Sequence, residues 1–175
     1  MKKSIIIALA LLLSFAAAAQ SAQDYHFKIH QGRLLWQRVF PAADSCRVEV
    51  FVQNLLELGC FQKIEVISGI ISCEMTGQML NFKAPGYGRM ELPLYVANGA
   101  FSGHVTIQLK SDRYRVTLSR ICETSSSFGT SSLSDFAVDN GAFKEDFAVP
   151  AGHVFDFNMT ALFYRLSVDP YGDEW

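Results

Sequence analysis

The chain has 175 residues and a nearly balanced charge, with 15 Lys and Arg against 17 Asp and Glu side chains, a formal net charge of −2. This is the length of one ordinary domain that can bury a core of its own. The mildly acidic balance argues against nucleic acid or an anionic membrane as a partner, because both require clustered positive charge.

The first 19 residues are typical of a secretory signal peptide. A basic start at Lys2 and Lys3 precedes the apolar run Ile5–Leu13 and a string of alanines that ends at Ala19. These are the three parts of a cleavable export signal, and we expect cleavage between residues 19 and 22. The run is too short for a membrane span, which takes roughly 20 apolar residues.

Lipid anchoring is not expected, since it requires a cysteine at the cleavage point and the first cysteine is Cys46. Loss of residues 1–19 leaves 13 basic and 17 acidic side chains, a net charge of −4. No later run is long and apolar enough for a bilayer. We therefore expect a soluble protein, periplasmic or secreted, without membrane contact after signal removal. A single domain is expected over residues 24–169, followed by an acidic tail at 170–175.

The domain is expected to begin with a strand pair and then a helix. Tyr25–Phe40 reads as extended chain that turns near Gln31-Gly32. The next stretch is ambiguous, because valines at alternate positions favour a strand while apolar residues at helical spacing favour a helix. We predict a helix from about Asp44 to Leu58, since Asp44 or Ser45 can cap its start and Gly59 can end it.

A hairpin is predicted next, with Ser68-Gly69 as its turn. Apolar residues alternate on both sides of this turn, and the opposite face carries a favourable pair of unlike charges. The expected pairs are Val66 with Ile71, Ile64 with Cys73, and Lys63 with Glu74.

A three-stranded meander is predicted over Met90–Val96, Ser102–Lys110 and Arg113–Leu118. Asn98-Gly99 and Ser111-Asp112 are the expected two-residue turns. Both turns place the same residues of the middle strand on one apolar face, which a slip of one residue would destroy. The expected pairs are Leu92 with Val105, Met90 with Ile107, Leu109 with Tyr114, Ile107 with Val116, and Val105 with Leu118.

The last part of the domain is expected to be a loop and a helix. Residues 124–134 are mostly Ser, Thr and Gly and are predicted to form a mobile loop. After Pro150-Ala151-Gly152, apolar residues from Phe155 to Leu166 follow the face of a helix that Pro170 ends.

Four cysteines occur in a chain expected to be exported, where disulfides can persist. They are Cys46, Cys60, Cys73 and Cys122, and the sequence leaves their pairing open. In the predicted hairpin Cys60 lies opposite Gly77, about four residues along the strand from Cys73. This exceeds the roughly 7 Å Cα separation that a disulfide tolerates and disfavours that bond. Cys73 and Cys122 are expected on apolar faces as buried thiols.

No catalytic, metal or cofactor residue is predicted. His26 and His30 are four residues apart, but they lie in a predicted strand and lack an HExxH motif. No serine lies in a GxSxG turn. The spacing of the cysteines does not fit a zinc site.

One polar surface is a candidate ligand site. Opposite its apolar face the predicted meander presents a row of basic and amide side chains, which fits an anionic ligand or partner. The alternative is an ordinary solvated sheet face, which antiparallel sheets usually have. Arg120 is expected on the apolar face opposite Gly103, reaching solvent at the sheet margin. The candidate residues are His104, Gln108, Lys110, Arg113 and Arg115.

Residues 110–115, which read Lys-Ser-Asp-Arg-Tyr-Arg, resemble the hairpin signature of an uncharacterised family of small exported proteins from Gram-negative gut anaerobes. The resemblance implies an α+β fold like that of the TATA-binding protein (TBP-like), a curved antiparallel sheet with two helices on one face. It covers roughly Gly32 to Leu166. The family's usual Asp-Gly turn is Ser111-Asp112 here. The family has no assigned activity, and a fold by itself does not imply DNA binding.

Three functions are compatible with the sequence. The first is a non-enzymatic binding or accessory module of the cell envelope, which holds a ligand or an envelope protein on its curved sheet. The second is an enzyme, such as a hydrolase, with a site assembled from loops. The third is a structural protein-interaction module. Because no acid–base or nucleophile motif is found, the first and third are favoured over an enzyme.

Overall fold

The computed structural model describes residues 25–42, 47–126 and 129–167. The signal peptide predicted over residues 1–19 and the tail predicted over 170–175 lie outside this range. Cys46 and the predicted helix end at Pro170 lie outside it as well.

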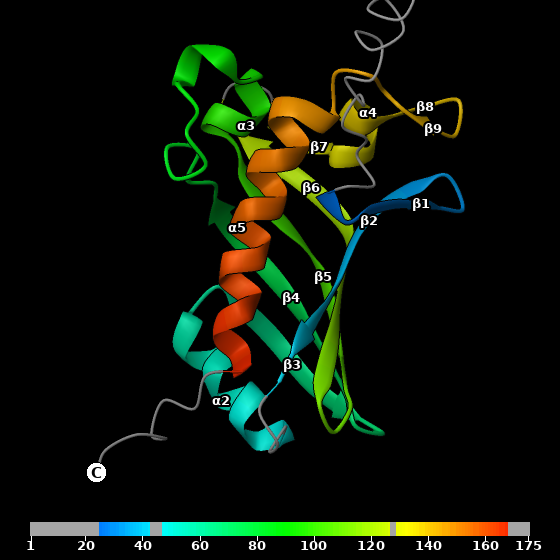
Figure 1. Cartoon of the computed structure of the whole chain (residues 1–175), viewed down its shortest axis with the longest axis vertical. Coiled ribbons are helices and arrows are strands. Elements are labelled where there is room, and N and C mark those ends of the chain that lie inside the picture. The colour runs from blue at the N-terminus through cyan, green and yellow to red at the C-terminus, as the bar shows by residue number, and fades with distance from the viewer. Residues whose placement is uncertain (1–24, 43–46, 127–128, 168–175) are drawn as a thin grey trace, which may run out of the picture.

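The fold is α+β, with a large antiparallel sheet and its two longer helices on one face (Figure 1). The strand order is β1-β2-β6-β5-β4-β3, and β7 pairs with β6. The strands are β1 (Phe27–His30), β2 (Arg33–Pro41), β3 (Phe61–Ile67), β4 (Ile70–Met79), β5 (Ala100–Leu109), β6 (Arg113–Ser125), β7 (Gly129–Ser132) and the small pair β8 (Val138–Asp139) and β9 (Ala142–Phe143). The helices are α2 (Val48–Leu58), α3 (Leu94–Asn98), α4 (Leu133–Ala137) and α5 (His153–Tyr164), with 3-10 turns at Arg89–Glu91 and Arg165–Ser167.

The core lies between the sheet and the two longer helices. Alternate residues of β2, β4, β5 and β6 point inward and are mostly buried. Trp36 of β2 stacks on Phe163 of α5, with ring centroids 5.7 Å apart. Tyr114 of β6 donates a 2.8 Å hydrogen bond from its hydroxyl to the carbonyl of Phe163, so α5 is held to the sheet by polar as well as apolar contacts.

Several predicted elements are confirmed. β1 and β2 turn at Gln31-Gly32, and α5 occupies the predicted helix after Gly152. The helix predicted from Asp44 begins at Val48, with Arg47 in extended conformation before it. It ends as expected at Gly59, whose φ of 69° is the left-handed geometry that glycine adopts without a steric penalty. Among the described residues, no helix has the length and apolar character needed to cross a bilayer.

The first strand of the predicted meander is wrong. Instead of Met90–Val96 forming a strand, Arg89–Glu91 is a 3-10 turn and Leu94–Asn98 is helix α3. Pro93, which cannot donate a ladder hydrogen bond, precedes α3 with a φ of −57°. Met90 is 97 % exposed, so it contributes nothing to the core.

The neighbour of β5 is β4, which offers the same alternation of apolar residues. Val105 and Ile107 face Cys73 and Ile71 of β4, in place of the predicted Leu92 and Met90. On its other side β5 pairs with β6 as predicted, across the Ser111-Asp112 turn. The confirmed pairs are Leu109 with Tyr114, Ile107 with Val116, and Val105 with Leu118.

Among the described residues, β3, β4 and β6 each contain one β-bulge, and each bulge includes one residue with positive φ. These residues are Lys63, Gly77 and Arg120. An extra residue bends its strand and increases its twist. Each bulge is therefore a point at which its strand bends.

The bulge in β3 corrects the predicted register of the first hairpin. Val66 pairs with Ile71 as expected, but Glu74 faces Gln62 rather than Lys63, because Lys63 is the extra residue. Cys60 consequently lies beside Thr76, to whose amide it is joined by a 2.9 Å backbone hydrogen bond, and not opposite Gly77.

The bulge in β6 reverses which residues face the core. Arg120 and Ile121 together lie opposite Gly103, so Ile121 turns inward and Arg120 outward. The prediction that Arg120 lies on the apolar face is therefore wrong. The same holds for Cys122, which is half-buried and pairs with Ser102 on the outer face. Glu123 is turned into the core instead and is 2 % exposed.

The loop predicted over residues 124–134 is also wrong in part. β6 continues to Ser125, and Gly129–Ser132 pairs with it as β7. α4 follows at once, and the Ser132 hydroxyl accepts a hydrogen bond from the amide of Ser134 at its start. Serine and threonine, taken as loop formers, here serve as strand and helix-cap residues.

Candidate functional site

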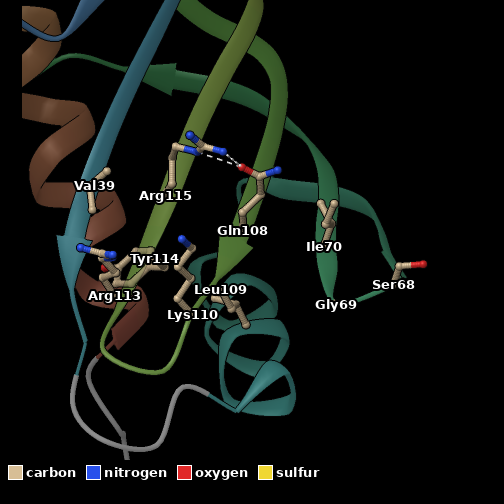
Figure 2. Close-up of a pocket in the computed structure, with 10 residues that line it drawn as sticks. All are labelled: Val39, Ser68, Gly69, Ile70, Gln108, Leu109, Lys110, Arg113, Tyr114 and Arg115. Carbon is tan, nitrogen blue, oxygen red and sulfur yellow. Dashed lines mark hydrogen bonds between the residues drawn. The ribbon is translucent and has the colours of Figure 1, made fainter.

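A hollow of about 440 Å³ lies on the outer face of the sheet, opposite the helices. It is formed where the β5–β6 hairpin and the β3–β4 turn lie side by side, as Figure 2 shows. Val39 of β2 closes one side and Ile70 of β4 the other. Its residues are Val39, Ser68, Gly69, Ile70, Gln108, Leu109, Lys110, Arg113, Tyr114 and Arg115.

Two tight turns fix the shape of this hollow. In the β5–β6 turn the Lys110 amide donates a 2.8 Å hydrogen bond to the Arg113 carbonyl, which places both side chains at the open end. In the β3–β4 turn Ser68 and Gly69 have φ values of 52° and 74°, the geometry that two-residue hairpins require. The hollow is thus built on paired strands rather than on a flexible loop.

Gln108 orients Arg115 across the floor of the hollow. These residues are paired neighbours on β5 and β6. Arg115 donates from Nε at 2.8 Å and also from Nη2 to the Oε1 atom of Gln108 (Figure 2). One side of the guanidinium is therefore occupied, and its outer edge, formed by Nη1 and Nη2, retains hydrogens that can bind a carboxylate in bidentate fashion.

The hollow is positively charged. Lys110, Arg113 and Arg115 line it, and none of its ten residues carries a carboxylate. Arg113 Nε lies 3.7 Å from Asp112 Oδ1 in an exposed pair, which is worth little in water. Three cations beside the apolar side chains of Val39 and Ile70 can hold an anion that carries an apolar body.

The sequence-predicted site is only partly brought together. Gln108, Lys110, Arg113 and Arg115 all line the hollow. His104 does not line it, because it lies four residues from Gln108 along β5, about 13 Å at the usual rise of a strand.

His104 belongs to a separate charged cluster on the outer face. Its Nδ1 atom lies 3.1 Å from Glu74 Oε1, and Arg120 Nη2 lies 3.4 Å from the same oxygen. The Glu74 carboxylate offsets the positive charge of this cluster. His104 therefore adds nothing to the cationic hollow.

A second polar cluster, on the inner side, could not be predicted from sequence. Asp156 of α5 accepts hydrogen bonds at Oδ1 from Trp36 Nε1 at 2.7 Å and from His26 Nδ1 at 2.8 Å. These partners are 120 and 130 residues away in the chain, so no local motif marks them. The cluster places a histidine beside a carboxylate, which a search for short motifs misses.

Among the described residues, no group of three or more His, Cys, Asp and Glu side chains is arranged to hold a metal ion. Cys60, Cys73 and Cys122 carry free thiols. Burial raises the pKa of the Cys73 thiol to about 12, which keeps it protonated and unreactive.

No family model and no curated protein matches the chain. Two solved structures are similar to it. A TBP-like protein from Parabacteroides distasonis ATCC 8503 is 12 % identical with a TM-score of 0.49, over 79 % of this chain and 93 % of that one. A DUF4468 family protein from Bacteroides ovatus ATCC 8483 is 11 % identical with a TM-score of 0.45, over 80 % of this chain and 84 % of that one. Neither description names an activity.

Proposed function

We propose that this chain is an exported, non-enzymatic binding or accessory module of the cell envelope that holds a carboxylate-bearing ligand on its outer sheet face. The observation that supports it most is the cationic hollow, with Lys110, Arg113 and Arg115 along its lining and no carboxylate among them. In a chain whose overall charge is negative, such a local concentration of cations selects for anions. The signal-like residues 1–19 are the basis for export.

Arg115 supplies the specific part of this recognition. Gln108 holds one side of its guanidinium, so less conformational freedom is lost when the outer edge meets a carboxylate. Lys110 and Arg113 add longer-range attraction. The apolar walls at Val39 and Ile70, which are 55 % and 37 % exposed, favour a ligand with carbon atoms next to its acid group.

The test is binding of a tetraglutamate peptide to the chain from residue 20 onward, compared with tetraglutamine as the uncharged control. Arg115→Met should weaken tetraglutamate binding about 10- to 100-fold, because a hydrogen bond to a charged group contributes about 1.5–3 kcal/mol. Arg33→Met is the matched control, since Arg33 is an exposed arginine of β2 outside the hollow. Equal weakening by both variants would mean unspecific charge attraction and would contradict the proposal.

Export is tested separately. When the full chain is expressed in a Gram-negative host, the protein recovered from the periplasm or medium should begin between residues 20 and 23, as judged by its intact mass. Retention of Met1 in the cytoplasmic fraction would contradict the envelope assignment.

A further inference from the structure

The second cluster borders a groove on the inner side of the sheet, between α5 and β2, which lie side by side in Figure 1. The groove has a volume of about 350 Å³. It is separate from the cationic hollow, which lies across the sheet. The residues that matter for its chemistry are Arg38, His153, Asp156, Phe157, Thr160 and Tyr164.

The floor of the groove is a fixed network of hydrogen bonds. Asp156 is 8 % exposed and is held at Oδ1 by Trp36 and His26. Arg38 Nη1 donates a 2.6 Å hydrogen bond to Thr160 Oγ1 and lies 3.8 Å from Asp156 Oδ2. Because all these groups are held in place, their orientation is set before any ligand arrives.

This network offers both donors and acceptors without a net excess of charge. A carboxylate oxygen only accepts, so His26 donates from Nδ1 to Asp156, and Asp156 supplies the acceptor oxygens of the network. The Arg38 guanidinium has five N–H donors, of which the bond to Thr160 uses one. Since Arg38 lies beside Asp156, the two opposite charges offset each other. A neutral polar ligand therefore fits better than a free ion.

The wall of the groove is aromatic. Phe157 is 41 % exposed and Tyr164 is 54 % exposed. They are seven residues apart on α5, two turns or about 10 Å along the same side of the helix. His153 completes the row, with its ring stacked on Tyr25 at 5.1 Å. Exposed ring faces at this spacing can stack against flat, weakly polar surfaces.

We propose that this groove binds the sugar rings of a glycan. A pyranose ring presents C–H faces that pack on aromatic rings and hydroxyl edges that both donate and accept hydrogen bonds. The groove provides partners for both, the aromatic rings of Phe157 and Tyr164 and a mixed donor and acceptor floor at Arg38, Asp156 and Thr160. The proposal does not depend on the carboxylate site, because the two lie on opposite sides of the sheet.

The experiment titrates the chain from residue 20 onward with cellobiose, maltose and N,N′-diacetylchitobiose, and measures saturation transfer by NMR and dissociation constants by calorimetry. At least one disaccharide should bind. Phe157→Ala and Arg38→Met should each weaken that binding about tenfold, the loss expected when a hydrogen bond or a stacking contact is removed. Phe157 is partly exposed, so its variant should stay folded.

Two control variants separate this site from the other one. Leu56→Ala removes an exposed apolar side chain from α2, 57 % exposed, and should leave sugar binding unchanged. Arg115→Met should weaken tetraglutamate binding only, and Phe157→Ala should weaken sugar binding only. If none of the three disaccharides binds, or if binding is insensitive to Phe157→Ala and Arg38→Met, the proposal is overturned. Weaker tetraglutamate binding in Phe157→Ala would likewise overturn it, in favour of a peptide in the groove.

Discussion

Glu123 is a buried carboxylate with an incomplete set of hydrogen bonds. It is 2 % exposed, and its Oε1 atom has no hydrogen-bond partner among the described residues. Burial raises its pKa above the ordinary value of 4.5, and a hydrogen bond with Ser125 counteracts part of this shift. We predict that Glu123→Gln stabilises the fold at neutral pH, because it removes the charge and keeps the shape of the side chain.

The pH dependence of folding stability follows from the proton that Glu123 binds in the folded and unfolded states. With a raised pKa, the folded state keeps a proton on Glu123 at pH values where the unfolded chain has lost it. Stability therefore falls as the pH rises from the unfolded pKa through the folded one, and stays lower above both. Below about pH 4 the carboxyl is protonated in both states, and the variant should gain little. At neutral pH the gain should reach about 1–3 kcal/mol, because the variant replaces a buried charged carboxylate, whose desolvation is costly, by a neutral amide.

Urea unfolding across about pH 4 to 8 measures this difference. A gain of 1 kcal/mol corresponds to about 2–4 °C in melting temperature for a domain of this size. Glu145→Gln is the control, because Glu145 is exposed and should show no pH-dependent gain. A gain of equal size at every pH, or a loss at neutral pH, would show that the charge of Glu123 is not the destabilising feature.

Three further variants or measurements test other contacts. Gly99→Ala should destabilise the fold by about 1–3 kcal/mol in urea unfolding. The new Cβ would lie 2.2 Å from the Tyr95 carbonyl oxygen and 2.5 Å from Glu123 Oε1. An unchanged unfolding midpoint would show that this segment shifts freely to make room. Tyr114→Phe should cost about 1–3 kcal/mol through the lost bond to α5, and a stability equal to wild type would refute the importance of that bond. Thiol labelling at about pH 8, mapped by peptide mass, should modify the half-buried Cys122 before Cys73, which is 1 % exposed and has a pKa of about 12; equal rates would contradict the burial of Cys73.

The sequence predicts the β5–β6 hairpin correctly, because turn chemistry and apolar alternation agree over a short separation. The Ser111-Asp112 turn and the pair Val105–Leu118 are both found. The predicted pairing of β5 with Met90–Val96 is wrong, because alternation of apolar residues in β5 indicates that it has a neighbouring strand but not which strand that is. Met90–Val96 and β4 both carry alternate apolar residues, and the long-range competition is decided by Pro93 and by packing.

The two candidate sites also differ in how far the sequence predicts them. Four of the five predicted residues line the cationic hollow, since side-chain alternation along β5 and β6 suffices to place them on one face. His104 lies on the same face but four residues from Gln108 along β5, where it contacts Glu74 of β4 instead of the hollow. The groove beside α5 depends on Asp156 meeting His26 and Trp36 across most of the chain, and no pattern in the sequence encodes that contact.

The bulge at Arg120 shifts by one residue the alternation of inward and outward side chains along β6. Counting by twos from the buried Leu118 would send Glu123 to the outer face and Cys122 inward, but the extra residue reverses both. Deletion of Arg120 would therefore remove the bulge and still leave Ile121 and Glu123 on the inner face, because regular alternation from Leu118 then places both of them inward. When a related chain lacks this extra residue, its alignment with β6 should place the gap at residue 120, because a gap further along would mismatch the inward and outward positions between the two sites.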